Sequence, residues 1–441
     1  MNLHRILSFL TGFCLLFPGS GLAIVSPSVD TLLEEVTKPN IDISEFDQPL
    51  PPSPANSHYQ LGMRYLRNNK LDEAVEAFNK ALELDSRHIP TIMELTNIAF
   101  KQKRIKEAAS RSRTAIQIAP EDPRLHIIYA QVLVAQKKIP EAEKTLQTVI
   151  NLAPESVLPR MLLGNFYNIQ GEPEDALKEY QVAIQLNPLL PQPHLAAALT
   201  YIKTQQMDRA LQEADVLIEI VPQNPVSLAL KGVLYIQQNR LKEAIEQLKS
   251  AITVNYRYYP AHLLLGDVYV RLEDYEAAIE NYKNAISVAP NSTKANMLLG
   301  NAYLFNNQTS EAKNVFSTVL KMDPNNPITQ NNLAWIYIEE RENLDEAIQL
   351  AEAARKLAPG FPQILDTLGW AYYKKGDYQK ALENITAAVK MGIQDPMVYY
   401  HLGQVYMKRG NPSKARETFK QTLILDPNFD KADEIQEILN Y

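Results

Sequence analysis

The stretch Tyr259–Ser292, YPAHLLLGDVYVRLEDYEAAIENYKNAISVAPNS, contains two amphipathic helical patterns separated by a short turn. Side chains three or four residues apart lie on one face of an α-helix. The first pattern has this spacing through His262, Leu265, Gly266 and Tyr269, and the second through Ala278, Tyr282 and Ala285. Between them, Leu272–Tyr275 predicts a turn in which Asp274 caps the second helix, and Pro290 predicts the end of that helix. The stretch therefore predicts two antiparallel helices.

This unit recurs at a spacing of 34 residues, in eleven copies from Ala55 to Phe429. Each position of the repeat is named below after the residue that occupies it in Tyr259–Ser292. The copies begin near Ala55, Ile89, Pro123, Val157, Pro191, Pro225, Tyr259, Thr293, Pro327, Pro362 and Pro396. Only the ninth copy is one residue longer, within the turn at 341–344. A fixed period of this length predicts stacked helix pairs rather than separate globular domains.

Two positions of the repeat hold small residues. The Gly266 position is glycine or alanine in every copy except the second, where it is Thr96, and the Ala278 position is alanine in all eleven copies. Glycine inside a helix costs about 1 kcal/mol relative to alanine, so its recurrence indicates a packing requirement. We expect the two positions to face one another and to let the paired helices approach closely.

This pattern resembles the tetratricopeptide repeat, which also has a 34-residue period. The resemblance covers residues 55–429. It implies an all-α fold, a right-handed superhelical solenoid of about eleven antiparallel helix pairs, whose first helices line a concave surface that grips peptides. Residues 430–441 predict a C-terminal capping helix, because their apolar residues form one stripe and the rest of the segment is polar.

Residues 1–23 have the pattern of a secretory signal peptide. Arg5 is followed by the uncharged run Ile6–Phe17, and Gly21–Ala23 offers small residues for cleavage. An uncleaved membrane anchor and a cytosolic apolar tail are the alternatives. Residues 24–54 contain six prolines, and six acidic residues against one lysine, which predicts an extended linker. We therefore expect an exported protein, periplasmic or envelope-associated in a bacterium.

Composition and motifs argue against several classes of function. The formal net charge of −7 disfavours nucleic-acid binding, which requires a basic surface. Cys14 is the only cysteine and lies within the signal peptide, so a cleaved chain has no disulfide or cysteine-ligated metal. His58, His126, His194 and His262 occupy one position in every second repeat, about 20 Å apart, which is too far to share an ion. We expect these histidines to be interfacial, and we expect no cofactor, no metal and no catalytic site.

The side chains left for binding follow from helix geometry. The Asp267 and Leu263 positions lie outside the stripe that each first helix buries. The resemblance to tetratricopeptide repeats implies that these positions line the concave surface. We predict a peptide-binding site from the polar and aromatic residues at these positions: Asn97, Gln131, Asn165, Asp267, Asn301, Asn331, Trp335, Asp366, Trp370, Tyr400 and Gln404. The amides among them can donate to and accept from a peptide backbone.

Trp335 and Trp370 are the only two tryptophans and hold the same position in consecutive repeats. One interpretation is a platform that a ligand covers, and the other is a tight superhelical turn that hides both indoles. The strings NNLAW (331–335) and DTLGW (366–370) also resemble the terminal repeats of bacterial exported and envelope-associated repeat proteins.

The sequence thus predicts a non-catalytic scaffold that holds segments of partner proteins on its concave face, in the assembly of a cell-envelope or export complex. The alternative is an exported carbohydrate-handling protein that stacks sugars on Trp335, Trp370 and Tyr400, which makes polysaccharide a second class of partner. We expect no nucleic-acid partner, and no membrane span in the mature chain.

Overall fold

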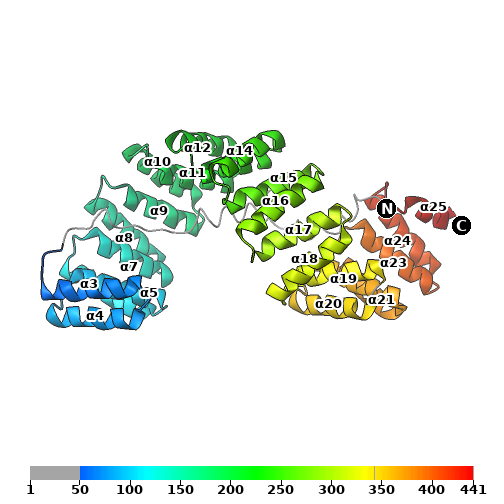
Figure 1. The fold of residues 1–441 in the computed structure, drawn as a ribbon, viewed down its shortest axis with the longest axis horizontal. Helices are drawn as coiled ribbons and strands as arrows, with labels where there is room; N and C mark the ends of the chain where they lie inside the picture. Colours follow the sequence, from blue (N-terminus) through cyan, green and yellow to red (C-terminus); the bar gives the residue numbers. More distant parts are fainter. Residues whose placement is uncertain (1–49, 342, 441) are drawn as a thin grey trace. The chain divides into compact units, whose positions relative to one another are not determined.

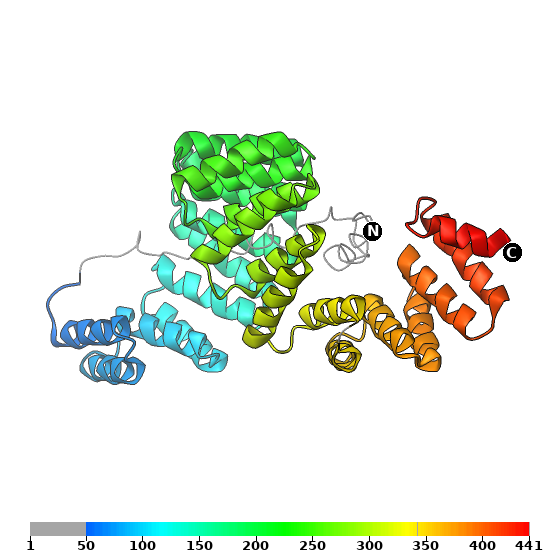
Figure 2. The same cartoon turned by 45° about the vertical axis from the view of Figure 1, so that its right-hand side comes forward.

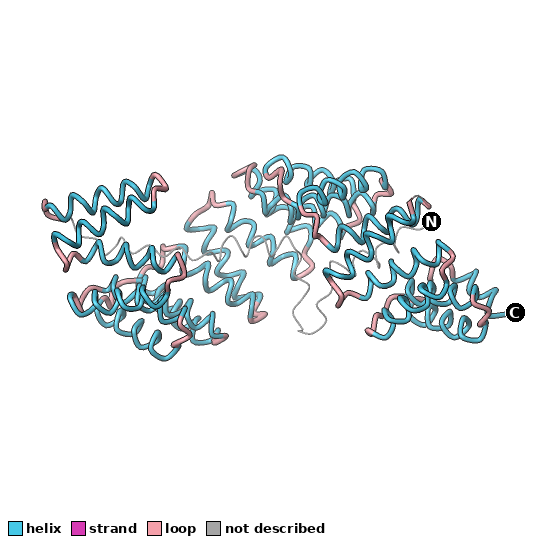
Figure 3. The backbone as a smooth tube through the Cα atoms, turned by 90° about the horizontal axis from the view of Figure 1, so that it is seen from below, coloured by secondary structure: helices cyan, strands magenta, loops and turns pink. Residues whose placement is uncertain are grey.

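The computed structural model describes residues 50–341 and 343–440, in which every regular secondary-structure element is an α-helix. These residues contain 23 helices, α3 to α25, joined by short turns (Figures 1 and 3). The all-α superhelical repeat fold predicted from the 34-residue period is confirmed. The predicted signal peptide, 1–23, and all but the end of the predicted linker lie outside the described residues.

The described chain divides into two compact units, and the first comprises residues 50–223. Its five helix pairs are α3 (Pro54–Arg67) and α4 (Leu71–Leu84), α5 (Ile89–Lys101) and α6 (Ile105–Ile118), α7 (Pro123–Ala135) and α8 (Ile139–Leu152), α9 (Val157–Gln170) and α10 (Pro173–Leu186), and α11 (Pro191–Lys203) and α12 (Met207–Ile220). Within this unit, each first helix packs on its second helix, and each second helix packs on the next pair.

The second unit comprises residues 224–440 and contains six pairs and one further helix. These are α13 (Pro225–Gln237) and α14 (Leu241–Val254), α15 (Tyr259–Arg271) and α16 (Tyr275–Val288), α17 (Thr293–Phe305) and α18 (Thr309–Met322), α19 (Pro327–Glu340) and α20 (Leu344–Leu357), α21 (Pro362–Lys375) and α22 (Tyr378–Lys390), α23 (Pro396–Lys408) and α24 (Pro412–Leu425), and α25 (Ala432–Asn440). Figure 2 shows the paired, side-by-side arrangement of successive helices.

The turn inside each helix pair contains a residue with left-handed backbone. In the pair α15–α16, Glu273 has a φ of 60°, and the Asp274 N–H donates to the Tyr269 carbonyl oxygen at 2.9 Å. The other pairs have left-handed residues at Asn69, Lys103, Lys137, Gly171, Gln205, Asn239, Asn307, Gly376 and Gly410, and the longer ninth copy has two, Arg341 and Asn343. Asp274 caps α16 as predicted, because its carboxylate accepts the Ala277 N–H at 3.1 Å.

The absence of a side chain at the Gly266 position leaves space that a large side chain of the second helix fills. A Cβ atom at Gly266 would collide with the ring of Tyr282, which lies one helical turn after the fully buried Ala278. The corresponding neighbours of the other glycines are Phe78 at Gly62, Tyr180 at Gly164, Leu248 at Gly232, Phe316 at Gly300, Ile385 at Gly369 and Phe419 at Gly403. The structure thus modifies the expectation that Gly266 simply faces Ala278. The glycine makes the space that an aromatic or aliphatic side chain fills.

The histidines of alternate repeats anchor each first helix to the turn before it. The ring Nε2 atoms lie at hydrogen-bond distance from backbone carbonyl oxygens: His126 from Pro120 (2.7 Å), His194 from Pro188 (3.0 Å) and His262 from Tyr256 (2.7 Å). Gln330 occupies the same position, and its side-chain amide donates to the Pro324 carbonyl at 2.8 Å. The predicted interfacial role is confirmed at these positions. Among the described residues, no group of histidine, cysteine and acidic side chains is arranged to hold a metal ion.

The helix α25 covers the end of the second unit. Its Ile435 is fully buried and packs with Ala415, Phe419 and Phe429. The predicted capping helix is therefore present. No helix in the described part of the chain combines the length and the apolar character that crossing a membrane requires.

Candidate functional site

In the fourth and seventh repeats, the residue at the Asp267 position forms a hydrogen bond with the tyrosine ring that fills the space beside the glycine. The Asp267 Oδ1 atom accepts the hydroxyl hydrogen of Tyr282 at 2.6 Å, and the Asn165 Oδ1 atom accepts that of Tyr180 at 2.7 Å. These polar side chains thus have an internal role that the sequence did not reveal. Asn165 is exposed, whereas Asn97, Gln131 and Asp267 are half-buried. All four lie on first helices, and their contact with a peptide stays a prediction.

Five of the predicted binding residues are buried. The exposed fractions of the residues are 8% for Asn301, 1% for Asn331, 9% for Trp335, 0% for Asp366 and 7% for Trp370. The geometry of a single helix had placed these positions away from the core. The structure corrects that placement, and of the two interpretations of the tryptophans it favours the one in which they are hidden.

The physical reason is that neighbouring first helices contact one another on this side. The Asn332 Nδ2 atom of α19 donates to the Asn301 Oδ1 atom of α17 at 3.1 Å. The His401 ring of α23 stacks on the Trp370 ring of α21, with centroids 3.9 Å apart and an interplanar angle of 17°. In both contacts the Leu264 position of one repeat covers the Asp267 position of the preceding repeat. A helical wheel of one isolated helix omits this contact.

Polar side chains converge where α19, α21 and α23 meet. We call this set the inner polar cluster, and it consists of Asn331, Asn332, Gln363, Asp366, Thr367 and His401, all buried. The His401 Nδ1 atom lies 2.9 Å from the Asp366 Oδ2 atom. Sequence reasoning missed Asn332, Gln363, Thr367 and His401. A usable signal was present, because the Leu264 position changes from leucine in the two preceding repeats to Asn332, Thr367 and His401.

Five polar atoms of this region have no hydrogen-bond partner within the protein. They are Asn331 Oδ1, Asn332 Oδ1, Gln363 Oε1, Thr367 Oγ1 and Trp370 Nε1. An unpaired buried polar group costs roughly 1–3 kcal/mol, so folded proteins seldom keep several in one place. With Gln330 Oε1, the two helices α19 and α21 carry six such atoms.

A buried carboxyl group lies beside the cluster. Asp395 is 8% exposed and caps α23, where its Oδ1 atom accepts the Met397 N–H at 2.9 Å. Burial raises the pKa of Asp395 to about 6, and the nearby Asp366 carboxylate acts in the same direction. The Met397 N–H and His401 oppose this shift, because both favour the charged form.

Tyr400 and Gln404, both predicted to bind a peptide, are bonded to the capping helix. The Gln404 Nε2 atom donates to the Glu434 Oε1 atom at 2.9 Å, and the Tyr400 hydroxyl donates to the same carboxylate oxygen at 3.2 Å. Burial and the Glu434 charge raise the pKa of Tyr400. In this structure these two side chains therefore join α23 to α25.

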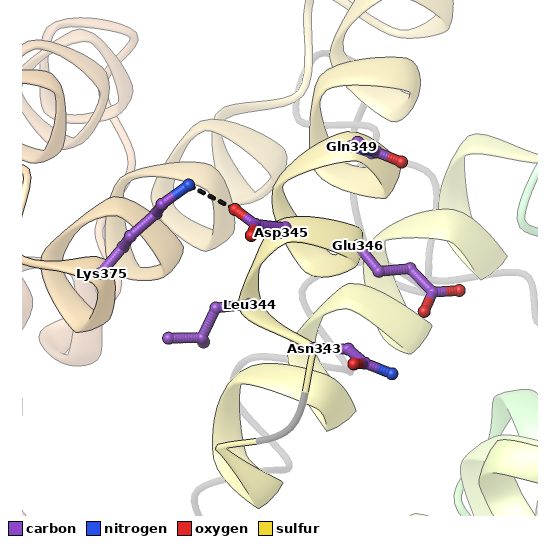
Figure 4. Close-up of a pocket in the computed structure, with 6 residues that line it drawn as sticks. All are labelled: Asn343, Leu344, Asp345, Glu346, Gln349 and Lys375. Carbon is purple, nitrogen blue, oxygen red and sulfur yellow. Dashed lines mark hydrogen bonds and ion pairs between the residues drawn. The ribbon is translucent and has the colours of Figure 1, made fainter.

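A hydrophilic hollow of about 560 Å³ lies at the N-terminal end of α20 (Figure 4). It is lined by Asn343, Leu344, Asp345, Glu346, Gln349 and Lys375, and an ion pair joins Lys375 to Asp345. All of these except Leu344 are exposed. With solvated groups and no buried polar atom, this hollow is a weaker candidate than the inner polar cluster.

The helix pairs, their glycine and alanine positions and their stacking define a tetratricopeptide repeat protein. Two models described as tetratricopeptide repeat match residues 55–88 and 99–165. The model described as the cilia and flagella-associated protein 70 C-terminal domain matches residues 218–438, just over half of the 441 residues. The chain belongs to this family of tetratricopeptide repeat proteins.

No curated protein matches the chain by sequence. Among solved structures, Cut9–Hcn1 of the APC/C hetero-tetramer is similar over 88% of this chain and 97% of its own, at 14% identity and a TM-score of 0.46. A tetratricopeptide repeat protein from Parabacteroides merdae is similar over 57% of this chain and 99% of its own, at 16% identity and a TM-score of 0.47. Yeast Tom70 is similar over 88% and 95%, at 14% identity and a TM-score of 0.41.

Proposed function

We propose that this chain is a non-catalytic scaffold that holds segments of partner proteins on the inner side of its first helices. The observation that carries the proposal is that tetratricopeptide helix pairs account for the described chain from Pro54 to Leu425. A helix pair buries its apolar face against its neighbours, so a row of pairs within one unit presents an extended surface for another chain.

The carbohydrate-handling alternative is disfavoured by the burial of its platform. A sugar stacks on an exposed aromatic face, whereas Trp335 and Trp370 are 9% and 7% exposed. Tyr400 is the third residue of the predicted sugar-stacking platform, and its hydroxyl donates a hydrogen bond to Glu434. Neither indole therefore offers the exposed face that the sugar-stacking alternative requires.

Site-specific photo-crosslinking tests the scaffold proposal. A photoreactive residue replaces Gln131 on the first helix α7, and in a matched protein it replaces Gln147 on the second helix α8. Gln131 is half-buried and Gln147 is exposed, so lower accessibility alone would favour crosslinking at Gln147. We expect partner proteins from the native cell to be captured at Gln131 and not at Gln147. Equal capture at both positions, or none at Gln131, would count against an inner binding surface.

We further propose that the protein is exported and acts in a cell-envelope or export complex of a bacterium, as an envelope-associated repeat protein. The support is the charge and apolar pattern of residues 1–23 and the strings NNLAW and DTLGW. Cell fractionation with N-terminal sequencing tests it. A periplasmic chain that begins at Ile24 is the expected result. A membrane-bound chain that begins at Met1 would indicate the uncleaved anchor, and a cytosolic chain would contradict export.

A further inference from the structure

The first helices of the second unit change from apolar to polar at two adjacent positions. In α15 these positions are Leu263 and Leu264, and both leucines are fully buried. In α19 they are Asn331 and Asn332, and in α21 the second of them is Thr367. All three polar residues are as deeply buried as the leucines. Since the repeat stacks with leucine at both positions, the fold itself does not require polar groups there.

Internal contacts account for only part of this polarity. Asp366 is paired with His401, and the Asn332 Nδ2 atom donates to Asn301. The atoms left without a protein partner are Asn331 Oδ1, Asn332 Oδ1, Gln363 Oε1, Thr367 Oγ1 and Trp370 Nε1. Three of these accept hydrogen bonds, the indole nitrogen donates, and a hydroxyl does either. This is the complement of a peptide backbone, which presents N–H and C=O groups in alternation.

We propose that α19 and α21 form a main-chain-binding site for an extended, uncharged segment of a partner protein. Asn331, Asn332 and Gln363 accept backbone N–H groups of the segment, and Thr367 and Trp370 donate to its carbonyl oxygens. This inference rests on the proposed scaffold function and locates the binding in two of the eleven repeats.

The charges around the site indicate an uncharged segment. The Asp366 Oδ2 atom already lies 2.9 Å from His401 Nδ1, and the Lys374 ammonium lies over the Trp370 ring, 4.7 Å from its centroid. Asp395 is held as the cap of α23. Each of these groups already has an interaction within the protein. A charged side chain of the segment would therefore lose its hydration here without gaining an ion pair.

The spacing of the helices sets the length of the segment. Packed helices lie roughly 8–10 Å apart, and an extended chain advances about 3.3 Å per residue. Each first helix therefore meets about three residues, and α19 and α21 together meet about six. A segment of that length offers enough N–H and C=O groups for the five unpaired atoms.

Binding at this site requires the side chains over it to move. Each of the five atoms is buried in this structure, so an incoming segment must displace its neighbours before hydrogen bonds form. Association is therefore expected to be slower than a diffusion-limited encounter. It is also expected to change the fluorescence of Trp335 and Trp370, the only two tryptophans of the chain.

Peptide binding to the full chain tests the proposal. The probes are ten-residue peptides of neutral composition, with matched sets in which two residues are lysine or aspartate, and affinity is measured by fluorescence anisotropy. The double variant Asn331→Leu/Thr367→Val replaces polar groups with apolar ones of the kind found at Leu263 and Leu264. We expect it to bind neutral peptides at least about tenfold more weakly while its unfolding midpoint stays the same or rises. The control Gln147→Leu changes an exposed amide on the second helix α8, outside the predicted binding face, and is expected to bind like the natural chain.

The outcomes separate this inference from the scaffold proposal. If peptides bind the natural chain and the double variant equally, the unpaired groups serve internal waters instead, and the inference is overturned while the scaffold proposal stands. Stronger binding of the lysine or aspartate peptides would also overturn it. If no peptide binds and photo-crosslinking at Gln131 captures no protein, the scaffold proposal fails as well. Should the double variant misfold, Trp370→Phe removes only the indole donor, and unchanged peptide affinity in that variant would contradict the site.

Discussion

At the residue scale, the space beside each glycine decides how closely a helix pair packs. A Cβ atom at Gly266 meets the rigid ring of Tyr282, whereas one at Gly232 meets the flexible Leu248 side chain, whose Cγ lies 2.9 Å away. Overpacking a core costs about 1–3 kcal/mol, while replacing a helical glycine with alanine gains about 1 kcal/mol. We expect Gly266→Ala to destabilise its helix pair and Gly232→Ala to be nearly neutral. Amide hydrogen exchange of α15–α16 and of α13–α14 measures both, and equal effects would contradict the role of the ring.

The left-handed turn residues lead to a second prediction at this scale. Glu273 has a φ of 60°, where side chains with a Cβ are strained and glycine is not. We expect Glu273→Gly to stabilise the pair α15–α16 by about 1 kcal/mol. The control Glu280→Gly makes the same replacement at an exposed site inside α16 and is expected to destabilise by about 1 kcal/mol. Hydrogen exchange of α15–α16, measured during chemical denaturation, reports both changes in stability. If the two variants changed the stability of this pair in the same direction, the prediction would be refuted.

Asp395 makes stability depend on pH. Its pKa is raised from 3.8 to about 6, so the folded chain holds the proton more tightly than the unfolded chain does. This group therefore stabilises the fold below its ordinary pKa, and that contribution is lost as pH rises through about 6. Asp395→Asn keeps an oxygen that accepts the Met397 N–H and avoids a buried charge. We expect the unfolding free energy near neutral pH to increase by about 1–3 kcal/mol.

Tryptophan fluorescence during urea unfolding measures this effect, because both tryptophans lie on helices of the same unit. The variant and the natural chain are compared at about pH 5 and about pH 7, and the difference between them is expected to be larger at the higher pH. Asp433→Asn, at an exposed position of α25, provides the control. A larger difference at the lower pH would reverse the sign and exclude Asp395 as the cause.

At the element scale, α25 protects the last helix pair. Its fully buried Ile435 and the bonds from Glu434 to Tyr400 and Gln404 join it to α23 and α24. Burying one large aliphatic side chain contributes about 1.5–3 kcal/mol, so deletion of α25 is expected to speed amide exchange in α23 and α24 about tenfold or more. Since a repeat contacts only its neighbours, α13 and α14 should exchange as before. Uniform acceleration across the unit would contradict this nearest-neighbour behaviour, and unchanged exchange in α23 and α24 would contradict the capping role.

The sequence predicted the starts of the helices better than it predicted the exposure of the side chains on them. Each first helix begins within one residue of its predicted start, for example at Pro54, Pro123 and Pro396, because turn prolines and a fixed period mark helix ends locally. The exposure of the inner positions could not be predicted in this way. It depends on contacts between helices one repeat apart, such as that of His401 with Trp370, which no single-helix pattern contains. The bonds from Tyr400 and Gln404 to Glu434 likewise depend on where α25 packs.

At the scale of the whole molecule, the division into residues 50–223 and 224–440 predicts two unfolding transitions. Stability in a repeat array is a sum of local terms, so a defect in one unit need not reach the other. Phe78→Ala removes a fully buried ring from the first unit and should cost about 3–5 kcal/mol there. Circular dichroism reports helices of both units, whereas fluorescence reports only the second, which contains Trp335 and Trp370. We expect Phe78→Ala to move the first phase of the circular dichroism curve to lower urea and to leave the fluorescence midpoint unchanged. An equal shift of both signals would show that the two units unfold as one cooperative array.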